Sequence, residues 1–60
     1  MPSDDTRRLL KVFGVAVTSL EDALDRKAPA DEIMKYDSDL ADRMRDVIGH
    51  VERLRSRRFE

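Results

Sequence analysis

Residues 39–54 read DLADRMRDVIGHVERL. Their apolar members recur every three or four positions, a spacing that puts them on one stripe of an α-helix and leaves the charged residues to water. The stripe consists of Leu40, Ala41, Met44, Val47, Ile48, Val51 and Leu54. Such a stripe is stable only when other apolar side chains pack against it. We therefore expect the rest of the chain to pack against this helix.

The composition is typical of long amphipathic helices in one domain. Of the 60 residues, 42% are charged, 40% are hydrophobic and 5% are aromatic, with two glycines and two prolines. The β-branched residues lie within helical periodicity and not in alternating runs bounded by turn residues. We therefore predict an all-α fold and a single domain over residues 1–60.

The first predicted helix covers about residues 4–27. Ser3 is a suitable N-cap, and Asp4 and Asp5 place negative charge where the helix dipole favours it. The expected seam of this helix is Thr6, Leu10, Phe13, Val17, Leu20 and Leu24, flanked on one side by Leu9, Ala16 and Ala23.

The second predicted helix covers about residues 30–58 and follows a turn at residues 28–29. Pro29 cannot continue the first helix but suits the start of the next. A break near residues 37–38 is the alternative to a continuous helix, which the supportive i,i+4 pairs at residues 31/35 and 39/43 favour. The expected seam is Ile33, Asp37, Leu40, Met44, Val47, Val51 and Leu54, flanked by Met34, Ala41 and Ile48.

A short turn between two helices of similar length predicts an antiparallel hairpin, in which facing residue numbers add up to about 57. A lone hairpin covers only the inner half of its stripes, so we expect it to associate as a homodimeric four-helix bundle. The predicted core and dimer interface is Leu9, Leu10, Phe13, Ala16, Val17, Leu20, Leu24, Ile33, Leu40, Ala41, Met44, Val47, Ile48, Val51 and Leu54.

Charge is distributed unevenly along the hairpin. The open end holds seven basic and four acidic residues, a net +3, whereas residues 21–42 hold three basic and eight acidic residues, a net −5. Two such rods attract when one is reversed, which predicts turns at opposite ends of the dimer. In length and helix arrangement the chain resembles Rop, a small homodimeric helical hairpin that binds paired RNA loops. No motif matches, so the resemblance assigns no RNA-contacting residue.

The sequence carries no catalytic or cofactor signature, and we predict a non-enzymatic protein without a cofactor. The chain has no cysteine. Asp42, Asp46 and His50 recur every fourth residue near Asp39, but this pattern is more typical of a solvated polar face than of a metal site. Asp37 interrupts the seam, either at the bundle edge or as a buried polar residue that specifies register.

The longest apolar run is residues 15–17, and the first residues are acidic, which argues against a signal peptide and a membrane span. We therefore expect a soluble cytoplasmic protein that does not bind membranes.

The predicted function is protein–protein interaction, as an oligomerising adaptor, an assembly factor or an inhibitory regulator. The expected partners are a second copy and another protein. The alternative is a regulator that binds RNA or DNA with the basic open end, against which stand a pI near 5.8 and few aromatic residues. The candidate partner-binding residues are Val12, Val15, Arg55, Arg57, Arg58 and Phe59.

Overall fold

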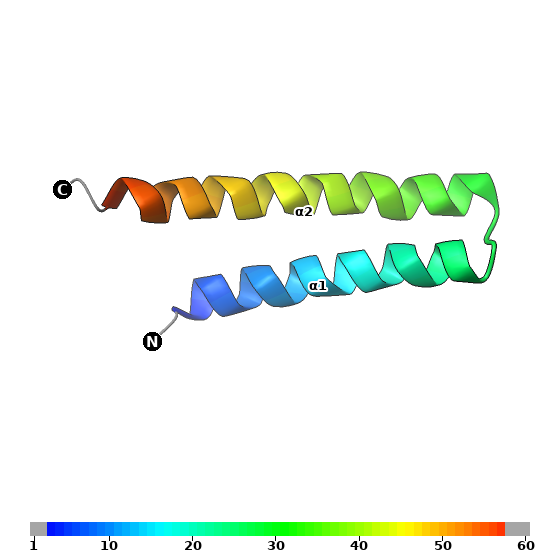
Figure 1. Cartoon of the computed structure of the whole chain (residues 1–60), viewed down its shortest axis with the longest axis horizontal. Helices are drawn as coiled ribbons and strands as arrows, with labels where there is room; N and C mark the ends of the chain where they lie inside the picture. The colour runs from blue at the N-terminus through cyan, green and yellow to red at the C-terminus, as the bar shows by residue number, and fades with distance from the viewer. Residues whose placement is uncertain (1–2, 58–60) are drawn as a thin grey trace.

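The computed structural model describes residues 3–57, which form two α-helices packed side by side as a hairpin (Figure 1). Helix α1 runs over Asp4–Asp25 and helix α2 over Ala30–Ser56. The hairpin is a rod of 48 × 18 × 13 Å whose two open ends lie together, opposite the turn. The predicted all-α fold and the antiparallel pairing of the two helices are confirmed.

Helix α1 begins where the sequence predicts, because Ser3 caps it. The Ser3 Oγ accepts a hydrogen bond from the Thr6 backbone N–H at 3.1 Å, and Asp4 and Asp5 lie in the first turn. Caps of this kind stabilise a helix by about 1 kcal/mol.

Helix α1 ends two residues before the predicted position because Lys27 adopts a left-handed conformation, with φ of 55°. The Ala28 N–H donates to the Ala23 carbonyl at 2.9 Å, and the Lys27 N–H donates to the Leu24 carbonyl at 3.2 Å. This pair of bonds is a Schellman motif, which usually has glycine at the left-handed position. The lysine places the chain in a tight reversal at a cost of about 1–2 kcal/mol.

Helix α2 begins directly after Pro29, whose carbonyl accepts the Ile33 N–H at 3.1 Å. No side chain caps this end, but Asp31 and Glu32 lie in the first turn. The helix continues without interruption through residues 37–38, so the alternative of a break there is wrong. Asp37 is exposed, and its carboxylate therefore does not oppose the continuity of the helix.

The two helices meet along rows spaced alternately by three and four residues, the spacing of a coiled-coil seam. Only Ala16 and Ala23 are fully buried among the described residues. Their small side chains allow the α2 backbone to approach closely. The covered or half-covered inner rows are Thr6, Leu9, Phe13, Ala16, Leu20 and Ala23 on α1, and Ile33, Tyr36, Leu40, Arg43, Val47 and His50 on α2.

The pairing register agrees with the prediction to within one residue. At the open end, Thr6 Oγ1 and His50 Nε2 share a hydrogen bond of 2.7 Å, and their numbers add up to 56. Near the turn, Arg26 donates to Glu32 at 2.7 Å, and these numbers add up to 58. The predicted value of about 57 lies between the two.

Three of the six predicted seam residues on α1 lie inward, Thr6, Phe13 and Leu20, and the other three positions are displaced by one residue. Leu10, Val17 and Leu24 are exposed, and the inward positions belong to the predicted flank of Leu9, Ala16 and Ala23. The physical reason is close approach, since the two alanines let the helix backbones come nearer than leucine would.

On α2 the predicted seam is displaced in the same sense. Met44 and Val51 are exposed, and Arg43 and His50 lie inward instead. Both are half-buried, with His50 hydrogen-bonded to Thr6 across the contact and the Arg43 guanidinium near Asp46. Leu54 is also partly exposed, because α1 begins at its level and leaves it overhanging.

Candidate interaction surface

Seven large apolar side chains lie exposed beside the inner rows and make one surface, which we call the open apolar face. Its members are 39–69% exposed. They are Leu10, Val17, Leu24, Met34, Met44, Ile48 and Val51.

Both helices contribute to the same side of the hairpin. Each member of the face directly follows an inner-row residue, as Leu10 follows Leu9 on α1 and Ile48 follows Val47 on α2. One residue corresponds to a rotation of about 100° around a helix. Because the helices are antiparallel and face each other, the same rotation on each turns both rows to one side of the pair. The result is a two-helix apolar surface along the length of the rod.

The two outward valines predicted to bind a partner lie on the other side of α1. Val12 and Val15 each precede an inner-row residue, and they are 40% and 58% exposed. The opposite edge of the hairpin therefore has two apolar positions among polar ones.

Two residues of the α2 inner row make polar contacts. His50 bonds to Thr6, and the Arg43 guanidinium lies 3.7 Å from the Asp46 carboxylate. The Arg43 Nε is buried without a hydrogen-bond partner. The inner contact therefore includes an unsatisfied polar atom, while the apolar side chains of the open face remain 39–69% exposed.

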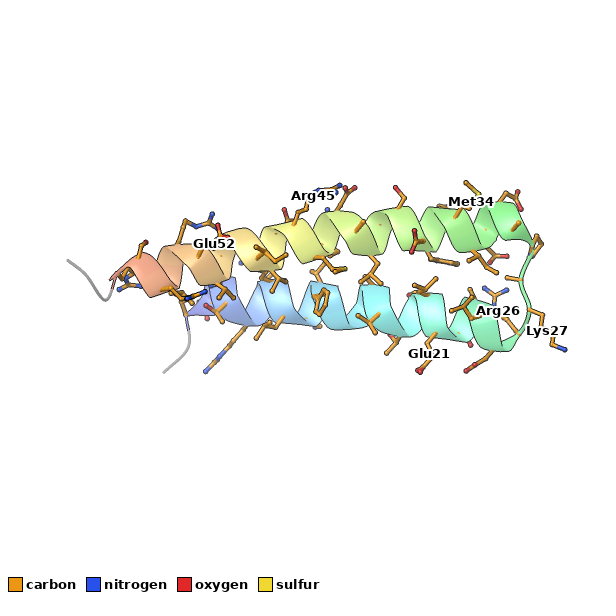
Figure 2. All side chains as sticks on the ribbon, turned by 45° about the horizontal axis from the view of Figure 1, so that its top comes forward. Glu21, Arg26, Lys27, Met34, Arg45 and Glu52 are labelled. Carbon is orange, nitrogen blue, oxygen red and sulfur yellow. The ribbon has the colours of Figure 1, made fainter. Side chains whose placement is uncertain are left out.

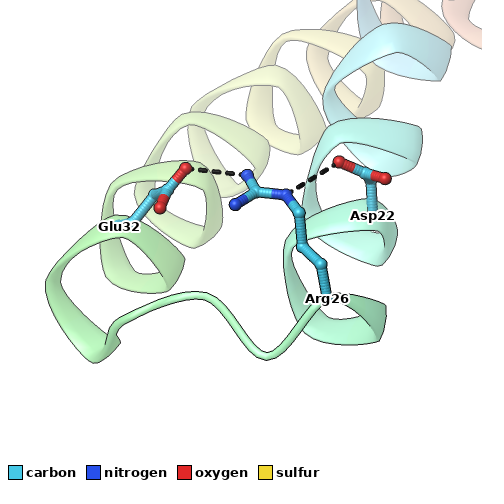
Figure 3. Close-up of polar contacts among 3 residues, drawn as sticks. All are labelled: Asp22, Arg26 and Glu32. Atoms are coloured by element: carbon cyan, nitrogen blue, oxygen red, sulfur yellow. Dashed lines mark hydrogen bonds and ion pairs between the residues drawn. The ribbon is translucent and has the colours of Figure 1, made fainter.

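Arg26 connects the two helices at the turn. Its guanidinium donates to Glu32 on α2 at 2.7 Å and to Asp22 on α1 at 3.0 Å (Figure 3). The hydrogen bond to Glu32, followed by that to Asp22, raises the pKa of Arg26 above its ordinary value. The group stays charged throughout the accessible pH range. Because the cluster is largely exposed, these ion pairs connect the two helices at the turn but add little to the stability of the fold.

Neither the Arg26 cluster nor the Thr6–His50 bond was predicted from the sequence. The spacing of Asp22 and Arg26 is an i,i+4 signal, and the predicted register brings each remaining partner within one residue of its observed place. These contacts could therefore have been found by applying the register to polar residues as well as to apolar ones.

The open end remains basic in three dimensions. Over residues 3–11 and 52–57 it has six basic and three acidic residues, a net +3. Among residues 3–57, the ion pairs involve only Arg26, Arg43 and Arg45 as cations, so the basic side chains of the open end have no ion-pair partner there. Arg55 and Arg57 are exposed, whereas Arg58 and Phe59 lie outside the described residues.

The three residues considered as metal ligands each interact with a different partner. Asp42 pairs with Arg45, Asp46 lies near Arg43, and His50 bonds to Thr6. No group of three potential ligands comes together within residues 3–57. Nor does this part of the chain contain a helix with the length and apolar character needed to cross a membrane.

Side chains on the backs of the helices are polar, apart from the edge of the open face. Glu21 points away from α2, and Arg45 and Glu52 point away from α1, as does Met34 (Figure 2). A shallow hollow on α2 is lined by Lys35, Tyr36, Ser38, Asp39 and Asp42. It is formed by one helix alone and is open to solvent, so the open apolar face is the stronger candidate site.

Comparisons of the chain with protein-family models, with curated proteins and with solved structures find no match. The resemblance to Rop therefore rests on length and helix arrangement alone, and fold does not imply function.

Proposed function

We propose that this chain is a non-enzymatic helical interaction module that forms a homodimeric four-helix bundle through the open apolar face. The bundle would act in the cytoplasm as an adaptor, an assembly factor or an inhibitory regulator of another protein. The observation that carries the proposal is the row of exposed leucine, valine, isoleucine and methionine side chains along both helices, which Glu21 interrupts on α1 and Asp37 on α2.

The solvent-accessible surface of the chain is large enough to include an interface with a second copy. The chain exposes 5056 Å², whereas a compact protein of this mass exposes about 4,000 Å². The difference of about 1,000 Å² is close to the ~800 Å² that each partner buries in a stable complex.

A second copy is the occupant that the charges favour. The positive open end and the negative turn end of one rod complement those of a reversed copy, since residues 21–42 carry a net −5. The apolar surface is concentrated on one side of the hairpin, so two copies can cover each other and close the assembly.

Mass measurement on a matched pair of variants tests the proposal. Leu10 lies on the open face and Val15 lies on the opposite edge of the same helix, and their exposures are 54% and 58%. Leu10→Glu should shift the molar mass in light scattering from dimer to monomer at micromolar concentration, because each copy would bury an unpaired charge. Val15→Glu should leave the mass unchanged. A wild-type chain that is a folded monomer at these concentrations would refute the proposal.

The alternative function is nucleic-acid binding by the basic open end. The absence of ion pairs to its basic side chains within residues 3–57 favours an anionic partner. Arg57→Ala should then weaken binding to RNA or DNA and lower the salt dependence of the affinity. Binding to a protein through the tail would instead depend on Phe59 at all salt concentrations.

A further inference from the structure

We propose a specific geometry for the dimer, in which the second copy is reversed end for end and the two-fold axis passes beside Gly14 and Ala41. This inference rests on the proposed homodimer. It concerns which residues of the two copies meet, and it follows from the observed register together with the spacing of the exposed rows.

The geometry of a reversed pair is restrictive. When two hairpins stack face to face with their turns at opposite ends, α1 packs against α1 of the second copy and α2 packs against α2. Facing residue numbers then add up to one constant for α1 and to another for α2. Because facing residues within the hairpin add up to between 56 and 58, the two constants together must equal about 114.

Both helices satisfy this requirement with layers that are apolar apart from Thr6, which faces Leu24 on α1, and Asp37, which faces Val47 on α2. On α1 a constant of 30 places Leu10 against Leu20 of the second copy and Phe13 against Val17. On α2 a constant of 84 places Ile33 against Val51. The two values add up to 114, which is the required total.

In this arrangement the two copies overlap along nearly the whole length of each helix. Its midpoint falls at position 15 of α1 and position 42 of α2, whereas the midpoints of the helices Asp4–Asp25 and Ala30–Ser56 fall near positions 14 and 43. Displacing the copies by seven residues retains the layers but leaves part of the apolar face uncovered.

The residues that directly follow layer residues form the outer rim of each contact, where facing numbers add up to 28 on α1 and 82 on α2, two less than in the layers. Gly14 and Ala41 therefore fall at the two-fold axis in this arrangement. Each lies on the outer rim of its contact, where it meets its own counterpart in the second copy. A Cβ on Gly14 would have no atom within 4 Å, so the hairpin itself does not require glycine there. Glycine within a helix costs about 0.5–1 kcal/mol relative to alanine. Close approach of a second α1 gives this glycine a purpose that the single chain lacks.

The remaining rim positions are complementary. Seven residues on either side of Gly14, Arg7 of one copy faces Glu21 of the other, an attractive pair. On α2, Met34 faces Ile48 of the second copy, which covers two of the most exposed side chains of the open face. A dimer with both turns at the same end would instead pair α1 with α2, and would place Gly14 near Ala41 of the other copy.

Disulfide formation distinguishes the two orientations, because the natural chain has no cysteine. Gly14→Cys alone and Ala41→Cys alone should each form a disulfide with the same residue of the second copy, since a bridge needs Cα atoms within about 7 Å. On a non-reducing gel the 7.0 kDa chain should shift to twice that mass. Val15→Cys, on the opposite edge, is the matched control and should remain a single chain under the same oxidation.

Each result supports or overturns the geometry. If the single variants do not cross-link while a mixture of Gly14→Cys and Ala41→Cys chains does, the turns lie at the same end and the inference is wrong, although the homodimer stands. If no combination cross-links and the mass is dimeric, the copies meet in another register and the inference is again wrong. A monomeric mass for the wild-type chain would overturn the proposed function itself.

Discussion

The row of α2 that packs against α1 is more polar than the exposed row beside it. The inner row includes Tyr36, Arg43 and His50, whereas the neighbouring exposed positions include Met44, Ile48 and Val51. In a protein that acted as a single hairpin, the opposite distribution would be expected, because apolar burial is the main driving force of folding. The contact between the two helices therefore uses only part of the apolar surface that this chain provides.

Enlarging a buried side chain of the inner row should produce the largest loss of stability of the hairpin. Ala23 is 0% exposed, and leucine at this position would push the helices apart at a cost of about 1–3 kcal/mol. Urea unfolding followed by circular dichroism should show the loss. Ala30→Leu, at an exposed position of α2, is the control and should change the midpoint little. Equal stability of the Ala23→Leu variant would contradict the close approach of the helices.

Replacing Asp37 would make the exposed row of α2 fully apolar and should strengthen association between copies. Asp37 follows the inner-row residue Tyr36 and interrupts the exposed apolar positions of α2. If a second copy covers it, Asp37→Leu should strengthen association by about 1–3 kcal/mol and loosen the preference for one association state. Sedimentation equilibrium measures both changes. Unchanged oligomeric behaviour would mean that Asp37 lies in water at the bundle edge.

Relieving the backbone strain at Lys27 should have the smallest effect on stability. This change should not affect the inner row and the exposed row differently. Lys27→Gly removes the cost of the left-handed conformation and should stabilise the chain by about 1 kcal/mol, somewhat less if glycine makes the unfolded chain more flexible. The thermal midpoint at a fixed protein concentration measures the gain. A loss of stability would show that the lysine side chain supports the turn more than its backbone strains it.

The elements and their register could be predicted from the sequence because each depends on local chemistry. Ser3 has the side chain of an N-cap, Pro29 restricts the position of the turn, and the turn determines which residues face each other. The early end of α1 could not be predicted, since a lysine seldom takes the left-handed position that glycine normally fills.

The division of the apolar residues between the two contacts could not be predicted from periodicity. The apolar band on each helix is two rows wide, and both rows repeat with the same period. On α1 the choice between Leu9 and Leu10 as the inward residue depends on how closely the helices approach, which the alanines at positions 16 and 23 set. The residues of the open apolar face were therefore predicted to belong to the apolar bands of the two helices, but they were not separated from the inner rows.

The uneven charge along the rod also has an electrical consequence. A net +3 at one end and −5 near the other give a single hairpin a permanent moment along its axis, to which the antiparallel helix dipoles contribute little because they oppose each other. Two reversed copies would cancel these axial moments by symmetry. A solution of such dimers should align only weakly in an electric field, whereas dissociated chains should orient strongly, so transient birefringence would report dissociation without any label.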